Sequence, residues 1–101
     1  MGTFAMPCDL ADTVALTAFS DAACDALGRV DVLVPNASAL ALGPDLSDWE
    51  ASLKVDLMTA VHACDRVVPW MAASGGGSIL LTSSISGLEA DPTPDYGYTA
   101  A

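Results

Sequence analysis

Val30–Val34, which reads VDVLV, is the stretch that decides the fold. It is short, mostly apolar and rich in β-branched residues, and Pro35 ends it. Such a run is typical of a strand buried on both faces, as the strands of parallel sheets are. Ser78–Ser84 (SILLTSS) predicts a second strand of the same kind.

The segment before VDVLV predicts a helix that begins near Asp12. Gly28 follows this helix as its expected C-terminal stop, and acidic residues fill the face opposite its apolar stripe. The apolar stripe at helical spacing consists of Leu16, Phe19, Ala23 and Leu27.

A second helix is predicted between the two strands, starting near Ser47. Ser47-Asp48-Trp49-Glu50 has the spacing of a capping box, and Pro69 is expected to kink or loosen the last turn. The predicted apolar stripe is Trp49, Leu53, Leu57, Val61, Cys64 and Val68, widened by Val55 and Met58. A helix that is apolar on more than one side usually packs on a sheet and on a further partner.

Thr3–Cys8 adds a remnant strand at the start of the chain. The order is then strand, helix, strand, helix, strand and the beginning of a helix. This alternation, with nearly all-apolar strands, predicts an α/β fold with a parallel sheet.

Composition excludes several classes of partner. The 101 residues make one small domain or part of one, with 52% hydrophobic and 16% charged residues and a net charge of -10. The three basic side chains, Arg29, Lys54 and Arg66, lie far apart, so we expect no nucleic-acid groove and no anionic membrane partner. No apolar run approaches the roughly 20 residues of a membrane helix.

The cysteines indicate neither a metal site nor a disulfide framework. Cys8, Cys24 and Cys64 are odd in number and widely separated, and His62 is the one other soft ligand. Three free thiols favour a reducing cytoplasm. The start at Met1 lacks a secretory pattern, so export is not expected.

Ligands of open parallel sheets bind at the carboxyl ends of the strands. The polar residues at those positions are therefore the candidates for chemistry, although each also has a structural explanation as a cap, a turn former, a strand-end hydroxyl or a partly buried aromatic. The candidates at and beyond the strand ends are Asp9, Leu10, Asn36, Ala37, Ser84 and Tyr98.

Taken together, these positions resemble the short-chain dehydrogenase/reductase family over essentially the whole chain. Asp9-Leu10 is similar to the Asp-Leu after the family's third strand, and Pro35–Ser38 is similar to its N-N-A-G stretch. Gly77–Gly87 resembles the strand that ends in the catalytic serine, which would be Ser84. Tyr98–Ala101 matches the first four positions of the Y-x-x-x-K signature, and the position four after Tyr96 is an alanine, so Tyr98 is the better candidate.

The resemblance implies a Rossmann-like fold and hydride transfer between NAD or NADP and a small carbonyl or alcohol. It implies that Tyr98 is the acid/base, that Ser84 orients the substrate oxygen, and that Asp56, at the family's catalytic asparagine, shares a proton relay. Asp9, Leu10, Asn36 and Ala37 would contact the cofactor. A tyrosine phenol ordinarily has a pKa of about 10, so the family's lysine is needed to make it a useful base.

The sequence also departs from the family pattern. Pro35 and Ser38 replace the first asparagine and the glycine of N-N-A-G, and Asp56 replaces asparagine, most simply as a tolerated variant. The glycine-rich phosphate loop, the lysine and everything beyond it are missing. We therefore expect residues 1–101 to be the central fragment of a single dinucleotide-binding domain, inactive alone. In the family's strand order, Thr3–Cys8 would be unable to join the other two strands without rearrangement.

Three hypotheses follow. The first is the oxidoreductase just described, a homo-oligomer in its full-length form. The second is a non-catalytic chain that associates with full-length subunits through the Ser47–Ala73 helix, which resembles the family's subunit-packing helix. The third, a flavodoxin-like or receiver-type domain, ranks last because the acidic cluster and lysine of receivers cannot be placed. Substrate specificity would lie partly in Ile85–Asp95, whose residues name no ligand.

Overall fold

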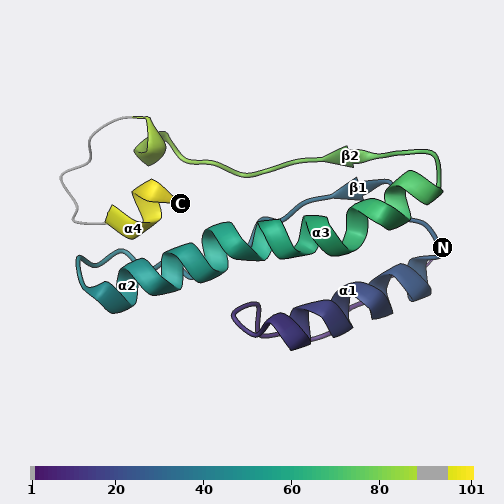
Figure 1. The fold of residues 1–101 in the computed structure, drawn as a ribbon, viewed down its shortest axis with the longest axis horizontal. Coiled ribbons are helices and arrows are strands. Elements are labelled where there is room, and N and C mark those ends of the chain that lie inside the picture. The colour runs from purple at the N-terminus through teal and green to yellow at the C-terminus, as the bar shows by residue number, and fades with distance from the viewer. Residues whose placement is uncertain (1, 89–95) are drawn as a thin grey trace.

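The computed structural model describes residues 2–88 and 96–101. Helices and a parallel strand pair alternate along the chain (Figure 1). The elements are α1 (Thr13–Leu27), β1 (Val32–Leu33), α2 (Leu46–Ala51), the π-helical η1 (Ser52–Leu57), α3 (Met58–Ala73), β2 (Ser78–Ile79), the 3₁₀ turn η2 (Ile85–Gly87) and α4 (Tyr96–Ala100).

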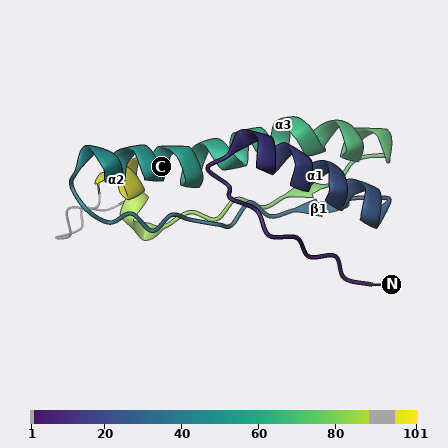
Figure 2. The same cartoon turned by 90° about the horizontal axis from the view of Figure 1, so that it is seen from below.

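The sheet has two parallel strands, with Val32 opposite Ser78 and Leu33 opposite Ile79. The Ser78 amide donates to the Asp31 carbonyl at 2.8 Å, and the Leu80 amide donates to the Leu33 carbonyl at 3.0 Å. Figure 2 shows α1 and α3 on the same side of the two strands. The α/β fold with a parallel sheet, predicted from VDVLV and SILLTSS, is confirmed as a partial Rossmann-like arrangement.

Both strands are shorter than predicted, and they are not buried on both faces. Val32 is 53% exposed and Leu81 is 65% exposed, because within the described residues helices cover one face of the pair. Thr3–Cys8 is not a strand, so that prediction is wrong. A strand needs a neighbour for its backbone groups, and the described sheet contains only β1 and β2. Thr3–Cys8 does not join the sheet, which agrees with the expectation that the family's strand order keeps it away from the other two strands.

The first helix begins and ends where the sequence predicts. The Asp12 Oδ1 atom accepts hydrogen bonds from the amides of Val14 at 3.0 Å and Ala15 at 3.3 Å. Gly28 closes the helix with φ 72°, and its amide donates to the Cys24 carbonyl at 2.8 Å. This left-handed conformation costs glycine little, which is why the helix stops here.

The second helix begins two residues before the predicted cap. Asp45 is the N-cap, and its amide donates to Asp48 Oδ2 at 3.3 Å, whereas the sequence placed a capping box at Ser47–Glu50. The helix runs on through the π turn of η1, which the sequence did not predict. Pro69 lies inside α3, which continues to Ala73, and the kink or loosening expected there stays a prediction.

The predicted apolar stripe of the second helix lies on the wrong face. Four of its six members are exposed, among them Leu53 by 38%, Leu57 by 40% and Val61 by 41%, whereas Trp49 and Cys64 are half-buried. The buried residues are instead Ser52, Thr59, Ala63, Val67 and Met71. The buried face thus combines the small side chains of Ser52, Thr59 and Ala63 with Val67 and Met71, which fill the core.

The packed core is small and lies between α1, α3 and β1. Cys24, Val67 and Met71 are buried together, with Val30 and Leu33 packed against them. In α1 the buried residues are Leu16, Ser20 and Cys24. Of the predicted α1 stripe, Leu16 is therefore buried, whereas Leu27 is 52% exposed.

Candidate active site

The chain segments that follow β1 and β2 stay side by side beyond the sheet. The hydroxyl of Thr82 donates to Asn36 Oδ1 at 2.6 Å and links the two segments. Asn36 thus holds together the two strand ends at which the sequence placed the site. Thr82 is a site residue that the sequence analysis missed, although its position beside the strand-end serines was a signal for it.

A cavity of about 390 Å³ lies against these segments and is closed by α4. We call it the polar cavity. It brings together all three predicted catalytic residues and two of the four predicted cofactor residues. Its lining includes Asn36, Ala37, Asp56, Ser84 and Tyr98.

Ser84 reaches the polar cavity from the end of the chain that follows β2. Its carbonyl accepts a hydrogen bond from the Gly87 amide at 3.0 Å, and its Oγ atom accepts from the Ser86 amide at 3.2 Å. The half-buried Ser84 is therefore fixed by the η2 turn that follows it. The backbone orients the hydroxyl oxygen, and accepting this bond does not use the hydroxyl proton.

Tyr98 reaches the polar cavity from α4, and Gly97 determines how α4 packs. A Cβ atom at Gly97 would lie 2.8 Å from the Cα atom of Trp49 and 3.2 Å from the Asp48 carbonyl oxygen. Only glycine permits this close crossing of α4 over α2. Gly97 was not among the sequence candidates. Its position directly before Tyr98 was the signal that could have identified it.

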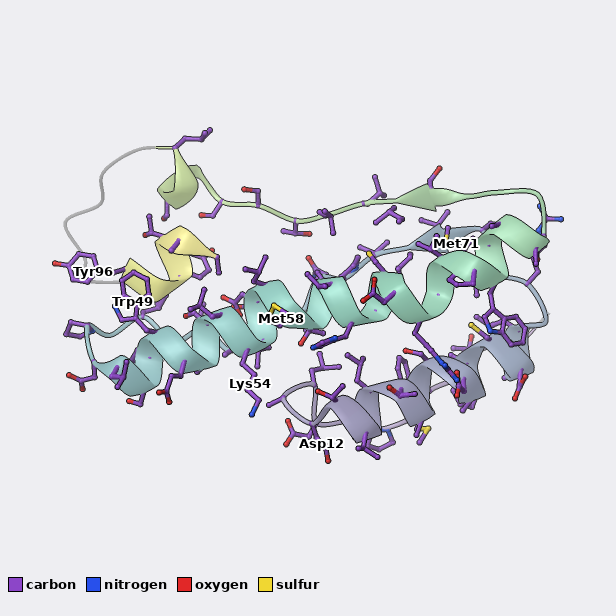
Figure 3. The ribbon with its side chains drawn as sticks, in the orientation of Figure 1. Asp12, Trp49, Lys54, Met58, Met71 and Tyr96 are labelled. Carbon is purple, nitrogen blue, oxygen red and sulfur yellow. The ribbon has the colours of Figure 1, made fainter. Side chains whose placement is uncertain are left out.

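Of the two tyrosines, Tyr98 is half-buried and lines the polar cavity. Tyr96 is 56% exposed and is absent from the lining. Figure 3 shows Tyr96 at the outer end of α4. This placement favours Tyr98 as the candidate acid/base, as the spacing to the chain end did.

Asp56 lies in the π turn of η1 and joins the helix to the segment that follows β1. Its Oδ1 atom accepts a hydrogen bond from the Ala39 amide at 2.8 Å. Its Oδ2 atom is buried and has no hydrogen-bond partner among the described residues. An asparagine would keep the bond to Ala39 and would place a neutral amide nitrogen where this unpaired carboxylate oxygen lies.

Asp9 and Leu10 lie apart from the polar cavity. Asp9 is exposed, and its Oδ1 atom accepts from the Ala11 amide at 3.0 Å, which is a local turn contact. The Leu10 carbonyl accepts from the Thr59 hydroxyl at 3.1 Å, and Leu10 lines a different, apolar space. Asp9 is therefore apart from the other predicted cofactor residues, whereas Leu10 shares the lining of that apolar space with Asn36 and Ala37.

The groups with shifted pKa values lie outside the polar cavity. The hydrogen-bonded Arg66 guanidinium holds the pKa of Asp21 below its ordinary value, and Asp21 in turn raises the pKa of Arg66. Burial raises the pKa of the Cys24 thiol, and the nearby Asp21 raises it further. These groups belong to the α1–α3 contact, so their shifts reflect packing and ion pairing rather than catalysis.

Within residues 2–88 and 96–101, no group of three metal-ligating side chains lies close enough to hold an ion. In the same part of the chain, no helix combines the length and apolar character needed to cross a bilayer. The predicted specificity segment Ile85–Asp95 is described only as far as Leu88, and residues 89–95 lie outside the described part.

Residues 2–101 match the family model described as short chain dehydrogenase. The chain belongs to this family. It is 35% identical over 81 residues to D-threitol dehydrogenase of Mycolicibacterium smegmatis, covering 76% of this chain and 31% of that protein. It is 33% identical over 86 residues to 7alpha-hydroxysteroid dehydrogenase of Escherichia coli, covering 82% of this chain and 34% of that protein.

Solved structures of short-chain dehydrogenases share the fold. A 7 alpha-hydroxysteroid dehydrogenase in complex with NADH and 7-oxo glycochenodeoxycholic acid superposes with a TM-score of 0.87 at 29% identity, over 96% of this chain and 39% of that one. A short-chain dehydrogenase/reductase from Burkholderia xenovorans gives a TM-score of 0.81 at 32% identity, over 95% and 38% of the two chains. The 101 residues thus span about a third of the length of these relatives.

Proposed function

We propose that this chain is the central part of an NAD(P)-dependent oxidoreductase that interconverts a small carbonyl and an alcohol by hydride transfer. The observation that carries the proposal is the polar cavity, in which Asp56, Ser84 and Tyr98 come from three separate elements and line one space. The family membership supports the reaction type.

In this proposal Tyr98 exchanges a proton with the substrate oxygen, and Ser84 donates a hydrogen bond to the same oxygen. The contact of Ser84 Oγ with the Ser86 amide does not use the hydroxyl proton, which suits that role. Asp56 holds the segment after β1 through Ala39 and thereby keeps Asn36 and Ala37 at the cavity wall. When bound, the nicotinamide cofactor supplies or accepts the hydride.

The residues present fit one end of such a cofactor. Asn36 and Ala37 line the cavity beside Ser84 and Tyr98, so they would contact the reactive end. Asp9 lies on a separate surface, and Leu10 lies outside the polar cavity, in the lining of the apolar space that also contains Asn36 and Ala37. We therefore propose that residues 1–101 form the central fragment of a single dinucleotide-binding domain, and that this chain alone is inactive. The three free cysteines support a cytoplasmic location.

A comparison of two preparations tests this function. The 101-residue chain and a longer protein that contains it are assayed with NAD and NADP by nicotinamide absorbance, using a panel of small carbonyls and alcohols. We expect no turnover by the chain alone. In the longer protein, Tyr98→Phe should reduce turnover by about 10²- to 10⁴-fold, the usual cost of losing acid/base assistance. A longer protein whose turnover survives Tyr98→Phe would contradict the assignment.

A second candidate function is association with full-length subunits through the 47–73 helix. The observation that favours it is the apolar face of α2, η1 and α3, because Leu53, Leu57 and Val61 are each more than a third exposed. Co-purification with a tagged longer relative tests it. A charge on this face, Val61→Asp, should abolish co-purification, and His62→Asp, on the same helix but outside the apolar stripe, serves as the control.

A further inference from the structure

The chain segment that follows β1 is held against η1 by two side chains of that turn. Asp56 Oδ1 accepts a hydrogen bond from the Ala39 amide at 2.8 Å, and the Ser52 hydroxyl donates to the Ala41 carbonyl at 3.3 Å. Ser52 and Asp56 are separated by about one helical turn, so they lie on the same side of η1. The segment is therefore held by η1 at two points, one amide and one carbonyl.

Between these two points the backbone is strained. Leu40 has φ 50°, and it is the one residue other than glycine with a positive φ among residues 2–88 and 96–101. Residues with a Cβ atom rarely adopt this conformation, which persists where surrounding contacts hold it. The Leu40 amide donates to Ser38 Oγ at 3.0 Å, and Ser38 lines the polar cavity. A segment released from Ser52 would relax at Leu40 and move this wall of the cavity.

Ser52 also contacts the helix that carries Tyr98. Ser52 is 0% exposed, and a Cβ atom at Gly97 would lie 3.2 Å from the Ser52 Cβ atom. Gly97 directly precedes Tyr98 in α4, which packs on α2 and η1 (Figure 1). Ser52 thus joins two walls of the polar cavity, because its hydroxyl contacts the segment after β1 and its Cβ atom contacts α4.

We propose that Ser52 is a positioning residue that sets the distance between Tyr98 and the cavity wall formed by Asn36 and Ala37. Ser52 is absent from the lining of the polar cavity, so it acts through the two elements that it contacts. This role rests on the proposed function, in which Tyr98 exchanges the proton and Asn36 and Ala37 contact the reactive end of the cofactor. Proton and hydride transfer to one carbonyl require both groups to be in place at once, and small displacements are costly.

Two properties of the site favour a serine at this position. The residue is fully buried beside the close crossing at Gly97, so it must be small, and the Ala41 carbonyl needs a donor. Serine is the smallest side chain that carries a hydrogen-bond donor. Two substitutions separate these requirements. Ser52→Ala keeps the Cβ atom and removes the donor, whereas Ser52→Thr keeps the donor and adds a methyl group that has no open space.

Steady-state kinetics of a longer protein that contains this chain test the role of Ser52, with NAD or NADP, whichever supports turnover. Ser52→Ala should raise the KM for the cofactor by about 2- to 10-fold, the usual effect of one hydrogen bond, and leave kcat unchanged. Ser52→Thr should lower kcat by about 10- to 100-fold, because α4 carries Tyr98 away, and leave the cofactor KM unchanged. A general loss of stability would not divide the two constants in this way.

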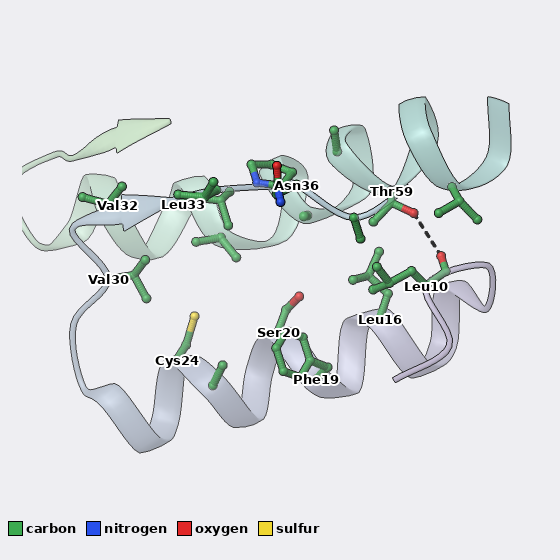
Figure 4. Close-up of a pocket in the computed structure, with 18 of the residues that line it drawn as sticks. Leu10, Leu16, Phe19, Ser20, Cys24, Val30, Val32, Leu33, Asn36 and Thr59 are labelled. Atoms are coloured by element: carbon green, nitrogen blue, oxygen red, sulfur yellow. Dashed lines mark hydrogen bonds between the residues drawn. The ribbon is translucent and has the colours of Figure 1, made fainter. Parts of the chain in front are cut away.

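Ser20→Ala is the matched control. Ser20 is 4% exposed and lines the apolar groove of about 340 Å³ between α1, β1 and α3 (Figure 4). The substitution removes a buried serine hydroxyl, as Ser52→Ala does, but it does so outside the polar cavity. Both kinetic constants should therefore be unchanged. Circular dichroism of each variant confirms that its helices are retained.

Two kinds of outcome are distinguishable. In a longer protein whose turnover requires Tyr98, equal effects of Ser52→Ala and Ser52→Thr on both constants, or no effect of either, would overturn the role of Ser52 alone. Where Ser52→Thr does not fold, Ser52→Ala decides, and a cofactor KM that stays unchanged contradicts the role. A longer protein without turnover, or with turnover that survives Tyr98→Phe, would overturn the proposed function and the role of Ser52 with it.

Discussion

The apolar groove between α1, β1 and α3 and the polar cavity at the strand ends share Pro35, Asn36, Ala37 and Asp56, yet different interactions hold them. The groove is bounded by the packed core of Cys24, Val67 and Met71. The cavity is held by single contacts, such as Thr82 on Asn36 and the crossing of α4 over α2 at Gly97. The fold and the site therefore have separate structural supports, which substitutions can disrupt one at a time.

The largest effect should come from the core. Met71→Ala removes a side chain that is 4% exposed from the small cluster and should lower the free energy of unfolding by about 2–5 kcal/mol. Met58→Ala is the matched control, because Met58 lies on the same helix and is 37% exposed (Figure 3). Urea unfolding followed by circular dichroism measures both. Equal losses for the two methionines would contradict the placement of the core.

These two methionines also show what the sequence could predict. The spacing of apolar residues located a helix between the strands correctly, but it put Met58 and Val61 on the buried face and left out Thr59, Ala63 and Met71. Hydrophobicity identifies large apolar side chains, whereas burial here depends on which side α1 and the strands approach. Small residues favour that approach, and a single sequence does not say where the neighbouring elements lie.

The candidate site residues could be predicted from the ends of the strands, because the carboxyl ends of parallel strands meet at one edge of the sheet. Asn36, Ser84 and Tyr98 were found in this way, and they line one cavity. Asp9 was included by the same rule and lies elsewhere, since the strand expected before it has no neighbour in the described sheet. Gly97 was missed because its role is a tertiary contact with Trp49, and its position directly before Tyr98 marks it only as a neighbour of the site.

Gly97→Ala should disrupt the site and leave the core intact. The new Cβ atom would lie 2.8 Å from the Cα atom of Trp49, so α4 must move and carry Tyr98 away from the cavity, at a cost of about 1–3 kcal/mol. In ¹H–¹⁵N spectra we expect shifts in α2 and α4 and unchanged signals from α1. Gly87→Ala is the control, because its Cβ atom would meet the Thr99 carbonyl at an ordinary 3.8 Å. Equal perturbation by both variants would refute the special role of Gly97.

Asp56→Asn should stabilise the folded chain at a residue that lines both the groove and the cavity. The asparagine oxygen keeps the bond from the Ala39 amide, and the buried oxygen without a partner is replaced by a neutral amide group. We expect the free energy of unfolding to rise by about 1 kcal/mol, measured by urea denaturation. Asp56→Ala loses the Ala39 bond and should instead be destabilising. If both substitutions lower stability equally, the unpaired oxygen carries no penalty.

The smallest effect should come from the exposed ion pair between α1 and α3. Arg66 donates two hydrogen bonds of 2.6 Å to the Asp21 carboxylate. The pKa of Asp21 is lowered in the folded chain, so the unfolded chain binds a proton first as the pH falls. The contribution of the pair is therefore complete above the unfolded pKa and is lost as the pH falls through the folded one. Asp21→Asn should remove this part of the acid destabilisation in urea midpoints measured across acidic pH. Asp25→Asn, an exposed aspartate on the same helix, should leave the acid profile unchanged, and an equal change in both variants would mean that general charge, not the Arg66 contact, determines it.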